Sequence, residues 1–319
     1  MEKQFSFAHK EKFKAAFWGF IVGDALGVPY EFSTRAEMKQ QPATTMTGFG
    51  TYDQPPGTWS DDTSMMLCVL ENMVHGWKIQ GLAGLFLKWA DEAHHTAHGE
   101  VFDIGITTRE ALDRYRINGD VNNMGSDEER SAGNGNLMRS LPYAFVEPLH
   151  LASVRMIHES GLTHQLAICR EATLMYIRMV RHMADGMDKM ESFLMAGGHL
   201  RAGWRLVDSD EPHPHRNEFR RLFSREFHLL SEDEIKSTGY VIHTLEAAIW
   251  CFLNSNSYTE TVLKAVNLGE DTDTVAALAG GLAGTFYGYN SIPEEWLEQL
   301  ARRVELEQLF QGWVFRTTE

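Results

Sequence analysis

The sequence predicts an all-α protein, a single globular domain built from many helices. Apolar residues recur at helical spacing in one segment after another, whereas the alternation typical of strands is scarce along the chain. The chain has 319 residues, of which 43% are hydrophobic and 23% are charged. That length and balance suit one large hydrophobic core. We expect a flexible N-terminal tail over residues 1–9 and one domain over residues 10–319.

The charge balance excludes several classes of protein. There are 29 basic and 44 acidic residues, which give a formal net charge of −15 and argue against nucleic-acid binding, a function that needs a basic surface. No apolar run approaches the ~20 residues of a membrane span, and the N-terminus lacks the apolar core of a signal peptide. Cys68, Cys169 and Cys251 lie far apart in apolar helical segments, as is typical of reduced, buried residues. We expect a cytoplasmic monomer without nucleic-acid or membrane partners.

The helices expected in the first part of the chain are separated by polar loops. The first helix ends where Gly27 and Pro29 interrupt the apolar pattern. Residues 33–59 are rich in Thr, Gly and Pro, so we expect a long irregular stretch, which in compact domains is usually functional or disordered. Helices are expected at residues 10–26, from 63 onward, at 82–93 and at 106–116.

The second part of the chain is expected to be helical as well. Residues 118–129 are polar and are expected to be mobile. Residues 207–217 are interpreted as an insertion loop rather than a domain boundary. Helices are expected at residues 165–183, 187–199, 240–253 and 258–266, from 272 onward, after Pro293 and around 296–310.

The stretch from Asn267 to Gly288 carries the most informative pattern. It opens with the acidic turn Asp271-Thr272-Asp273-Thr274 and continues as a helix made largely of Ala and Gly. Each Gly inside a helix costs about 1 kcal/mol relative to Ala, so we expect another backbone to approach this helix closely. Buried carboxylates must be paired, hydrogen-bonded or bound to a metal, and no Lys or Arg is near them in the sequence.

A second acidic turn, Ser60-Asp61-Asp62-Thr63, also precedes a helix, and Glu31 follows the first helix. Each turn alone is explained by helix capping, because Ser, Thr and Asp are favoured caps and anions suit a helix N-terminus. Two such turns together with Glu31 are harder to explain in this way. All-oxygen ligation suits Mg²⁺ or Mn²⁺ rather than Zn²⁺. The residues alone leave both helix caps and a dinuclear metal site open.

Other polar residues allow a functional and a structural interpretation each. Asp103 either caps the following helix or takes part in catalysis. The Gly133-Asn134-Gly135 turn is either an anion-binding concavity or a tight turn, and His164 is either a pocket residue or a structural histidine. The remaining loop histidines are interpreted as solvated. They are His94, His95, His98, His213 and His215.

Taken together, these segments resemble the ADP-ribosylglycohydrolase family, and within it the arginine-directed branch of bacterial dinitrogenase-reductase-activating glycohydrolases. They occur in the family's order and span residues 15 to 290. The matching segments are GDALGVPYEF (23–32), WSDDTSMM (59–66), FDIGITTREAL (102–112), SAGNGNLMRSLP (131–142), THQ (163–165), GYVIHTLEAAIW (239–250) and NLGEDTDTVAALAGGLAG (267–284).

The resemblance implies an all-α domain whose central cleft holds two Mg²⁺ or Mn²⁺ ions. The metal ligands it implies are Glu31, Ser60, Asp61, Asp62, Asp271, Asp273 and Thr274. The catalytic residues it implies are Asp103, Glu31 and Asp62, of which Asp103 would meet the guanidinium leaving group or act as acid or base. The substrate-binding residues it implies are Ser131, Gly133, Asn134, Gly135 and His164.

The implied reaction is a metal-dependent hydrolysis that removes ADP-ribose from the arginine side chains of ADP-ribosylated proteins. One alternative is an antidote protein that occludes an ADP-ribosyltransferase toxin, by inserting the tail or the 33–59 loop. Another is hydrolysis of serine-linked or small-molecule ADP-ribose conjugates. Three positions depart from the usual pattern. Relatives often carry Thr at Ser60, Gly at Glu270 and Asp at His243, and we assign His243 no role.

Overall fold

The computed structural model describes residues 6–207 and 213–315, and these residues confirm the all-α prediction. The only strands among them are β1 (Ser6–Phe7) and β2 (Val146–Glu147). The α-helices are α1 (Lys10–Gly27), α2 (Arg35–Gln40), α3 (Asp61–Val74), α4 (Ile79–Glu92), α5 (Ile106–Asn118), α6 (Leu149–Ser160), α7 (Ala167–Ala184), α8 (Lys189–Val207), α9 (Val241–Leu253), α10 (Tyr258–Val266), α11 (Thr272–Tyr287), α12 (Glu294–Gln299) and α13 (Arg303–Phe310).

Most expected helices are confirmed, but α2 and α6 were not anticipated. The signal for α2 was present, because Thr34 and Glu37 form a capping box in which the Thr34 N–H donates to the Glu37 carboxylate. Helix α8 extends to residue 207, beyond the expected end at 199. The two helices expected after Pro293 are α12 and α13. The last one begins at Arg303 rather than near 296, because Arg302 takes a left-handed conformation with φ 48° that an α-helix does not accommodate.

The N-terminal tail differs from the expectation. Ser6 and Phe7 pair antiparallel with Glu147 and Val146, and the Ala8 N–H donates to the Phe145 carbonyl over 2.7 Å. The segment from residue 6 is therefore anchored to the domain rather than flexible. Residues 1–5 of the expected tail, and residues 208–212 of the expected insertion loop, lie outside the described residues.

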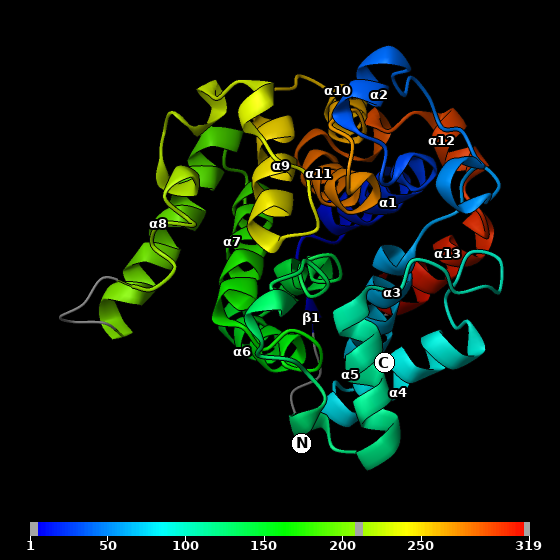
Figure 1. Cartoon of the computed structure of the whole chain (residues 1–319), viewed down its shortest axis with the longest axis vertical. Coiled ribbons are helices and arrows are strands. Elements are labelled where there is room, and N and C mark those ends of the chain that lie inside the picture. The colour runs from blue at the N-terminus through cyan, green and yellow to red at the C-terminus, as the bar shows by residue number, and fades with distance from the viewer. Residues whose placement is uncertain (1–5, 208–212, 316–319) are drawn as a thin grey trace.

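Helices α1 and α11 lie side by side at the centre of the molecule (Figure 1). Their approach depends on glycine: a Cβ added to Gly280 would lie 2.2 Å from the Gly19 carbonyl oxygen. A Cβ on Gly284 would lie 2.2 Å from the Ala15 carbonyl oxygen. The expectation that another backbone approaches the Ala/Gly helix is confirmed, and the partner is α1.

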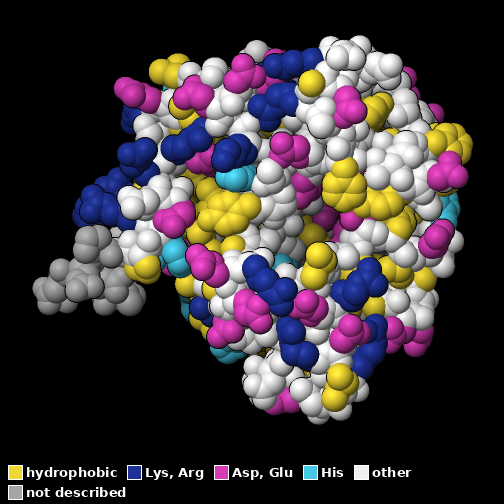
Figure 2. Space-filling model, viewed as in Figure 1, with side chains coloured by type: hydrophobic (Ala, Val, Ile, Leu, Met, Phe, Trp, Pro, Cys, Tyr) yellow, Lys and Arg dark blue, Asp and Glu magenta, His cyan; other side chains and the backbone are white. Residues whose placement is uncertain are grey.

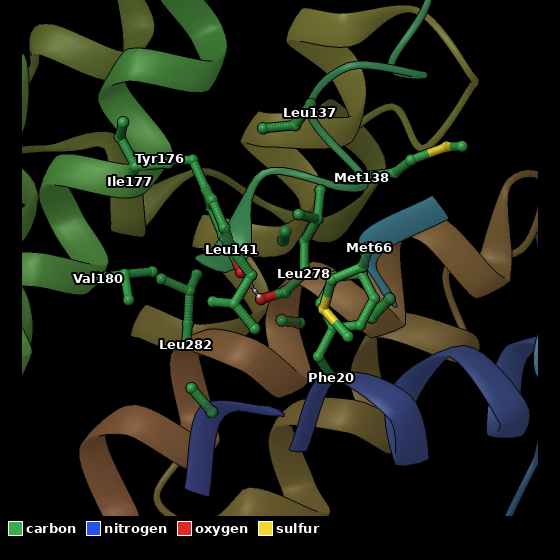
Figure 3. Close-up of a cluster of buried hydrophobic side chains, with 14 of the residues drawn as sticks. Phe20, Met66, Leu137, Met138, Leu141, Tyr176, Ile177, Val180, Leu278 and Leu282 are labelled. Atoms are coloured by element: carbon green, nitrogen blue, oxygen red, sulfur yellow. Dashed lines mark hydrogen bonds between the residues drawn. The ribbon is translucent and has the colours of Figure 1, made fainter. Parts of the chain in front are cut away.

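Helix α7 closes the other side of α11. The Tyr176 hydroxyl donates to the Leu278 carbonyl over 3.1 Å, and Gly281 leaves room for that hydroxyl, which would lie 2.6 Å from an added Cβ. Figure 3 shows side chains of α1, α3, α7 and α11 meeting in this region. The three cysteines are buried and free, as expected.

No described helix has the length and apolarity that a membrane crossing requires.

Candidate active site

The end of α1 and the start of α11 are in direct contact. A Cβ added to Gly27 would lie 2.3 Å from the Asp273 Cα, so only glycine permits this approach. The Thr272 hydroxyl donates to the Gly27 carbonyl over 2.8 Å. This contact brings Glu31, which follows α1, to the acidic turn at the start of α11.

Asp24 of α1 holds the start of α3 in place. This fully buried carboxylate accepts the Ser60 N–H at 2.9 Å, the Thr63 N–H at 3.0 Å and the Thr63 hydroxyl at 2.5 Å. Burial raises the pKa of Asp24 to about 6. No role was expected for Asp24 from the sequence, although its position in the apolar second half of α1 was a signal that it has a buried partner.

The starts of α3 and α11 face one another through their acidic turns. The Thr274 hydroxyl lies 3.5 Å from Asp62 Oδ1. The Asn134 amide donates to Asp271 Oδ2 over 2.8 Å and to the Thr244 hydroxyl over 3.0 Å. The Gly133–Gly135 turn is thereby tied to the carboxylates of α11.

Glu31, Asp103 and Asp273 each place a carboxylate oxygen within 4.8 Å of the others and form a candidate metal-binding group. The Tyr52 hydroxyl lies 2.6 Å from Glu31 Oε2 and 2.6 Å from Asp103 Oδ1. A phenol has one proton and an ionised carboxylate only accepts. Tyr52 therefore donates to only one of the two carboxyl groups at a time.

The acidic side chains around this point repel one another. Burial first, and then neighbouring carboxylates, raise the pKa of Glu31 to about 9. Burial likewise raises the pKa values of Asp61, Asp62, Asp103, Asp271 and Asp273. Among the described residues, the buried Oδ2 atoms of Asp62 and Asp273 have no hydrogen-bond partner. Orphaned carboxylate oxygens in an all-oxygen cluster suit a hard divalent cation.

A cleft of about 280 Å³ opens above the carboxylates. It is at the small end of ligand sites, so a nucleotide-sized ligand would extend over the rim, where Phe32 and Ile106 are 68% and 75% exposed. Figure 2 shows a hollow in this face with acidic side chains inside it and hydrophobic side chains around it. None of the described residues that line it is Lys or Arg.

Most of the residues singled out in the sequence meet here. The cleft is lined by Glu31, Asp61, Asp62, Asp103, Gly133, Asn134, Gly135, His164, Asp271 and Thr274. Ser60, Ser131 and Asp273 do not line it, although Asp273 adjoins the lining residues Glu31 and Asp103. The Ser60 hydroxyl oxygen accepts the Asp62 N–H over 3.2 Å, and the Ser131 hydroxyl donates to the Ser126 hydroxyl oxygen over 2.7 Å.

His164 packs against the glycine turn, since a Cβ on Gly135 would lie 2.5 Å from its Cε1. Burial and the Arg139 charge lower the pKa of His164 to about 3, so the ring is neutral. Arg139 donates to the Thr163 hydroxyl oxygen over 2.9 Å, and that hydroxyl lies 2.8 Å from His164 Nδ1. We assign the Thr163 hydroxyl as the donor and Nδ1 as the acceptor of this hydrogen bond. The proton of the neutral ring is then on Nε2, which is free to donate.

Comparison with known proteins agrees with this arrangement. The sequence profile of the ADP-ribosylglycohydrolase family matches residues 7–318. The chain belongs to this family. It is an enzyme that hydrolyses a glycosidic bond, as the sequence resemblance implied.

Similar ADP-ribosylglycohydrolases align over nearly the whole chain. The ADP-ribosylarginine hydrolase Tri1 of Pseudomonas putida (strain GB-1) is 31% identical over 305 residues, which are 94% of this chain and 77% of the relative. The ADP-ribosyl-[dinitrogen reductase] glycohydrolase of Rhodospirillum rubrum is 31% identical over 92% of this chain and 91% of the relative. A solved structure of an ADP-ribosylglycohydrolase-related protein complex aligns with a TM-score of 0.79 and 32% identity, over 96% of this chain and 98% of that chain.

Tyr52 is the second residue of this ADP-ribosylglycohydrolase site that the sequence analysis missed. It lies in the 33–59 stretch, where the sequence predicts only an irregular loop. The expectation that the loop histidines are solvated was wrong, because most of them contact buried or half-buried acidic groups. The pairs are His94 and His95 with Glu71, and His213 and His215 with Glu171.

Proposed function

We propose that this ADP-ribosylglycohydrolase releases ADP-ribose from arginine side chains of modified proteins. The observation that carries the proposal is the acidic cleft, whose described lining residues include no Lys or Arg. An arginine-linked substrate brings a guanidinium group to the cleft, and carboxylates bind guanidinium strongly. Two similar proteins carry their substrates in their names: the ADP-ribosylarginine hydrolase of Pseudomonas putida and the ADP-ribosyl-[dinitrogen reductase] glycohydrolase of Rhodospirillum rubrum.

We further propose that the cleft holds two Mg²⁺ or Mn²⁺ ions. Such ions, when bound, polarise substrate oxygens and lower the pKa of water. The orphaned oxygens of Asp62 and Asp273 and the raised carboxyl pKa values support this, because both are relieved by a cation. The Ser60 hydroxyl oxygen already caps α3, so it would both accept the Asp62 N–H and coordinate an ion. The proposed ligands are Glu31, Ser60, Asp61, Asp62, Asp271, Asp273 and Thr274.

The reaction adds water across the bond between C1′ of the ribose and the arginine nitrogen. The water oxygen joins C1′, and the leaving nitrogen takes a proton. Asp103 is the proposed proton donor, since it lines the cleft beside Glu31 and burial raises its pKa above the ordinary value. Glu31 and Asp62 would stabilise the positive charge that develops on the ribose, and Tyr52 would hold Glu31 and Asp103 in register.

The Gly133–Gly135 turn and His164 are the proposed binding site for the pyrophosphate. The neutral His164 ring offers its Nε2–H beside the turn. The Asn134 N–H already donates to the Gly239 carbonyl over 3.1 Å, so the turn offers fewer free N–H groups than the sequence suggests. Ser131 faces Ser126 and would act on the substrate only after turning away from it.

The antidote alternative gains no support from the described residues. Residues 6–7 of the tail that would enter a partner are paired with β2. We therefore keep hydrolysis as the proposal and use substrate linkage to test it.

The test compares two proteins that carry labelled ADP-ribose, one on arginine and one on serine. We expect release from arginine with Mg²⁺ or Mn²⁺, and none after chelation. The Asp61→Asn/Asp273→Asn double variant should remain folded and lose activity. Release of ADP-ribose from serine alone would contradict the proposed role of Asp103 as proton donor to the arginine nitrogen. Full activity after chelation would contradict the proposed metal site.

A further inference from the structure

Glu71, His94 and His95 form a compact polar cluster outside the acidic cleft. Glu71 lies in the last turn of α3, and the two histidines follow α4. Both Nε2 atoms lie 2.7 Å from the same oxygen, Glu71 Oε2. The two rings are 3.8 Å apart between centroids. Two imidazole nitrogens and one carboxylate oxygen therefore converge on one point.

The backbone takes an unfavourable shape to bring the two rings together. Ala93 has φ 56° and His95 has φ 63°, so residues with a Cβ occupy the left-handed region on both sides of His94. Such strain persists only where the surroundings hold it, and it is concentrated at functional sites. Here the Trp59 indole N–H donates to the His95 carbonyl over 3.0 Å.

Apart from His94 and His95, which hydrogen-bond the Glu71 carboxylate and hold its pKa at about 2, the surroundings do little to stabilise the Glu71 charge. A carboxylate in the last turn of a helix faces the negative end of the helix dipole. The nearby Arg302 is occupied, because its guanidinium pairs with Glu305 and donates to the Thr96 carbonyl. The other group against His95 is the Trp313 ring, edge-on at 5.8 Å.

The two imidazoles are able to act as ligands. Burial lowers the pKa of His95, so this ring is neutral at neutral pH and has a lone pair to share. The His94 and Glu71 side chains are 21% and 19% exposed, so an ion reaches the cluster from solvent and a water molecule can complete its coordination.

We propose that Glu71, His94 and His95 bind a zinc-class divalent ion, with one position left for water. Two histidines and a glutamate are a donor set that zinc uses, whereas the all-oxygen cleft favours harder cations. An ion bound through Nε2 replaces the proton that now joins each ring to Glu71, and that proton moves to Nδ1 of a neutral ring or is released from a charged one. The ion would fix the end of α3 to the loop after α4, and through Trp59 to the segment in front of Ser60. The proposal does not depend on the substrate of the cleft.

The test measures Zn²⁺ binding to the metal-free protein at micromolar concentration, with excess Mg²⁺ present to occupy the oxygen cluster. A chromophoric chelator reports affinity and stoichiometry. We expect one tight equivalent for the parent protein, and a loss of affinity of at least about 100-fold in His94→Ala and in Glu71→Gln, since even indirect partners of a metal contribute 10–100-fold. Zn²⁺ should also raise the thermal midpoint of the parent and not that of His94→Ala.

Two controls separate this cluster from other histidines. His98→Ala alters the same loop, where His98 Nε2 lies 3.1 Å from the Thr58 hydroxyl oxygen, and should bind Zn²⁺ as the parent does. His213→Ala/His215→Ala removes the second histidine pair and should also leave the tight equivalent in place. Tight binding that survives in His94→Ala and Glu71→Gln, or disappears only in the His213/His215 variant, would overturn the proposal.

Discussion

The contact between α1 and α11 makes a sharp prediction for Gly280→Ala. In an isolated helix this change is favourable by about 1 kcal/mol. Here the new Cβ would lie 2.2 Å from the Gly19 carbonyl oxygen, and neither atom belongs to a flexible side chain. The helices must separate by roughly 1 Å, and overpacking of this kind costs about 1–3 kcal/mol.

Because both partners at this contact are backbone, we take the upper end of that range and subtract the gain in helix propensity. The expected net loss is about 2 kcal/mol in the free energy of unfolding. For a chain of 319 residues it corresponds to a fall of about 3 °C in Tm. Urea unfolding followed by circular dichroism gives the free energy, and thermal unfolding gives Tm.

Gly84→Ala is the matched control. Gly84 lies inside α4, and an added Cβ there meets nothing within 4 Å. The free energy of unfolding of this variant should rise by up to about 1 kcal/mol. If Gly280→Ala is as stable as the parent, or if both variants lose stability equally, the idea that α1 and α11 are held at backbone contact is wrong.

Three further predictions concern the site and its supports. Tyr52→Phe keeps the ring contact with Phe102 but loses the hydroxyl contacts with the Glu31 and Asp103 carboxyl groups. We expect kcat to fall about 10- to 100-fold, as for other residues that position metal ligands, while the circular dichroism spectrum stays unchanged. An unchanged kcat would exclude a positioning role for Tyr52. Glu159→Ala leaves the fully buried Arg139 unpaired and should cost about 3–5 kcal/mol in urea unfolding; a loss under 1 kcal/mol would contradict a buried ion pair. Burial lowers the pKa of Lys189 to about 8, below its value in the unfolded chain, so its contribution to stability should rise from pH 8 toward 10.5 as only the unfolded chain keeps that proton. The difference in unfolding free energy between the parent and Lys189→Met should therefore grow over this range, and identical pH dependence of both proteins would refute the assignment.

The sequence predicted the helices best where apolar periodicity was strong and end signals were clear. It also located the acidic turns of α3 and α11, because hydroxyl and carboxyl groups at a helix start form a local pattern. It could not place Tyr52 or Asp24, since their roles depend on which distant segments fold against them. The Tyr52 hydroxyl bridges residues 31 and 103, and Asp24 serves a helix that starts at residue 61.

The wrong expectations for Ser131, His94 and His95 have the same cause, which is contact with residues that the local sequence does not reveal. Ser131 was expected to face the substrate because it adjoins the glycine turn, but its hydroxyl donates to Ser126. His94 and His95 were expected to be solvated because their own loop is polar. Their partner Glu71 lies 23 and 24 residues earlier in the chain, beyond the range of any local pattern.

The pairing of α1 with α11 also bears on synthesis. Gly27 and Thr272 are joined by a hydrogen bond across 245 positions, so at about 5–20 residues per second the ribosome delivers the second partner roughly 12–50 s after the first. During that interval α1, which is buried on nearly every side in the finished enzyme, has no α11 to cover it. We expect ribosome-bound chains that stop before residue 272 to remain protease-sensitive and to bind chaperones, and protection before that point would show that another segment covers α1 in the meantime. The cleft, which needs residues on both sides of this interval, then forms only after residue 274 has been translated.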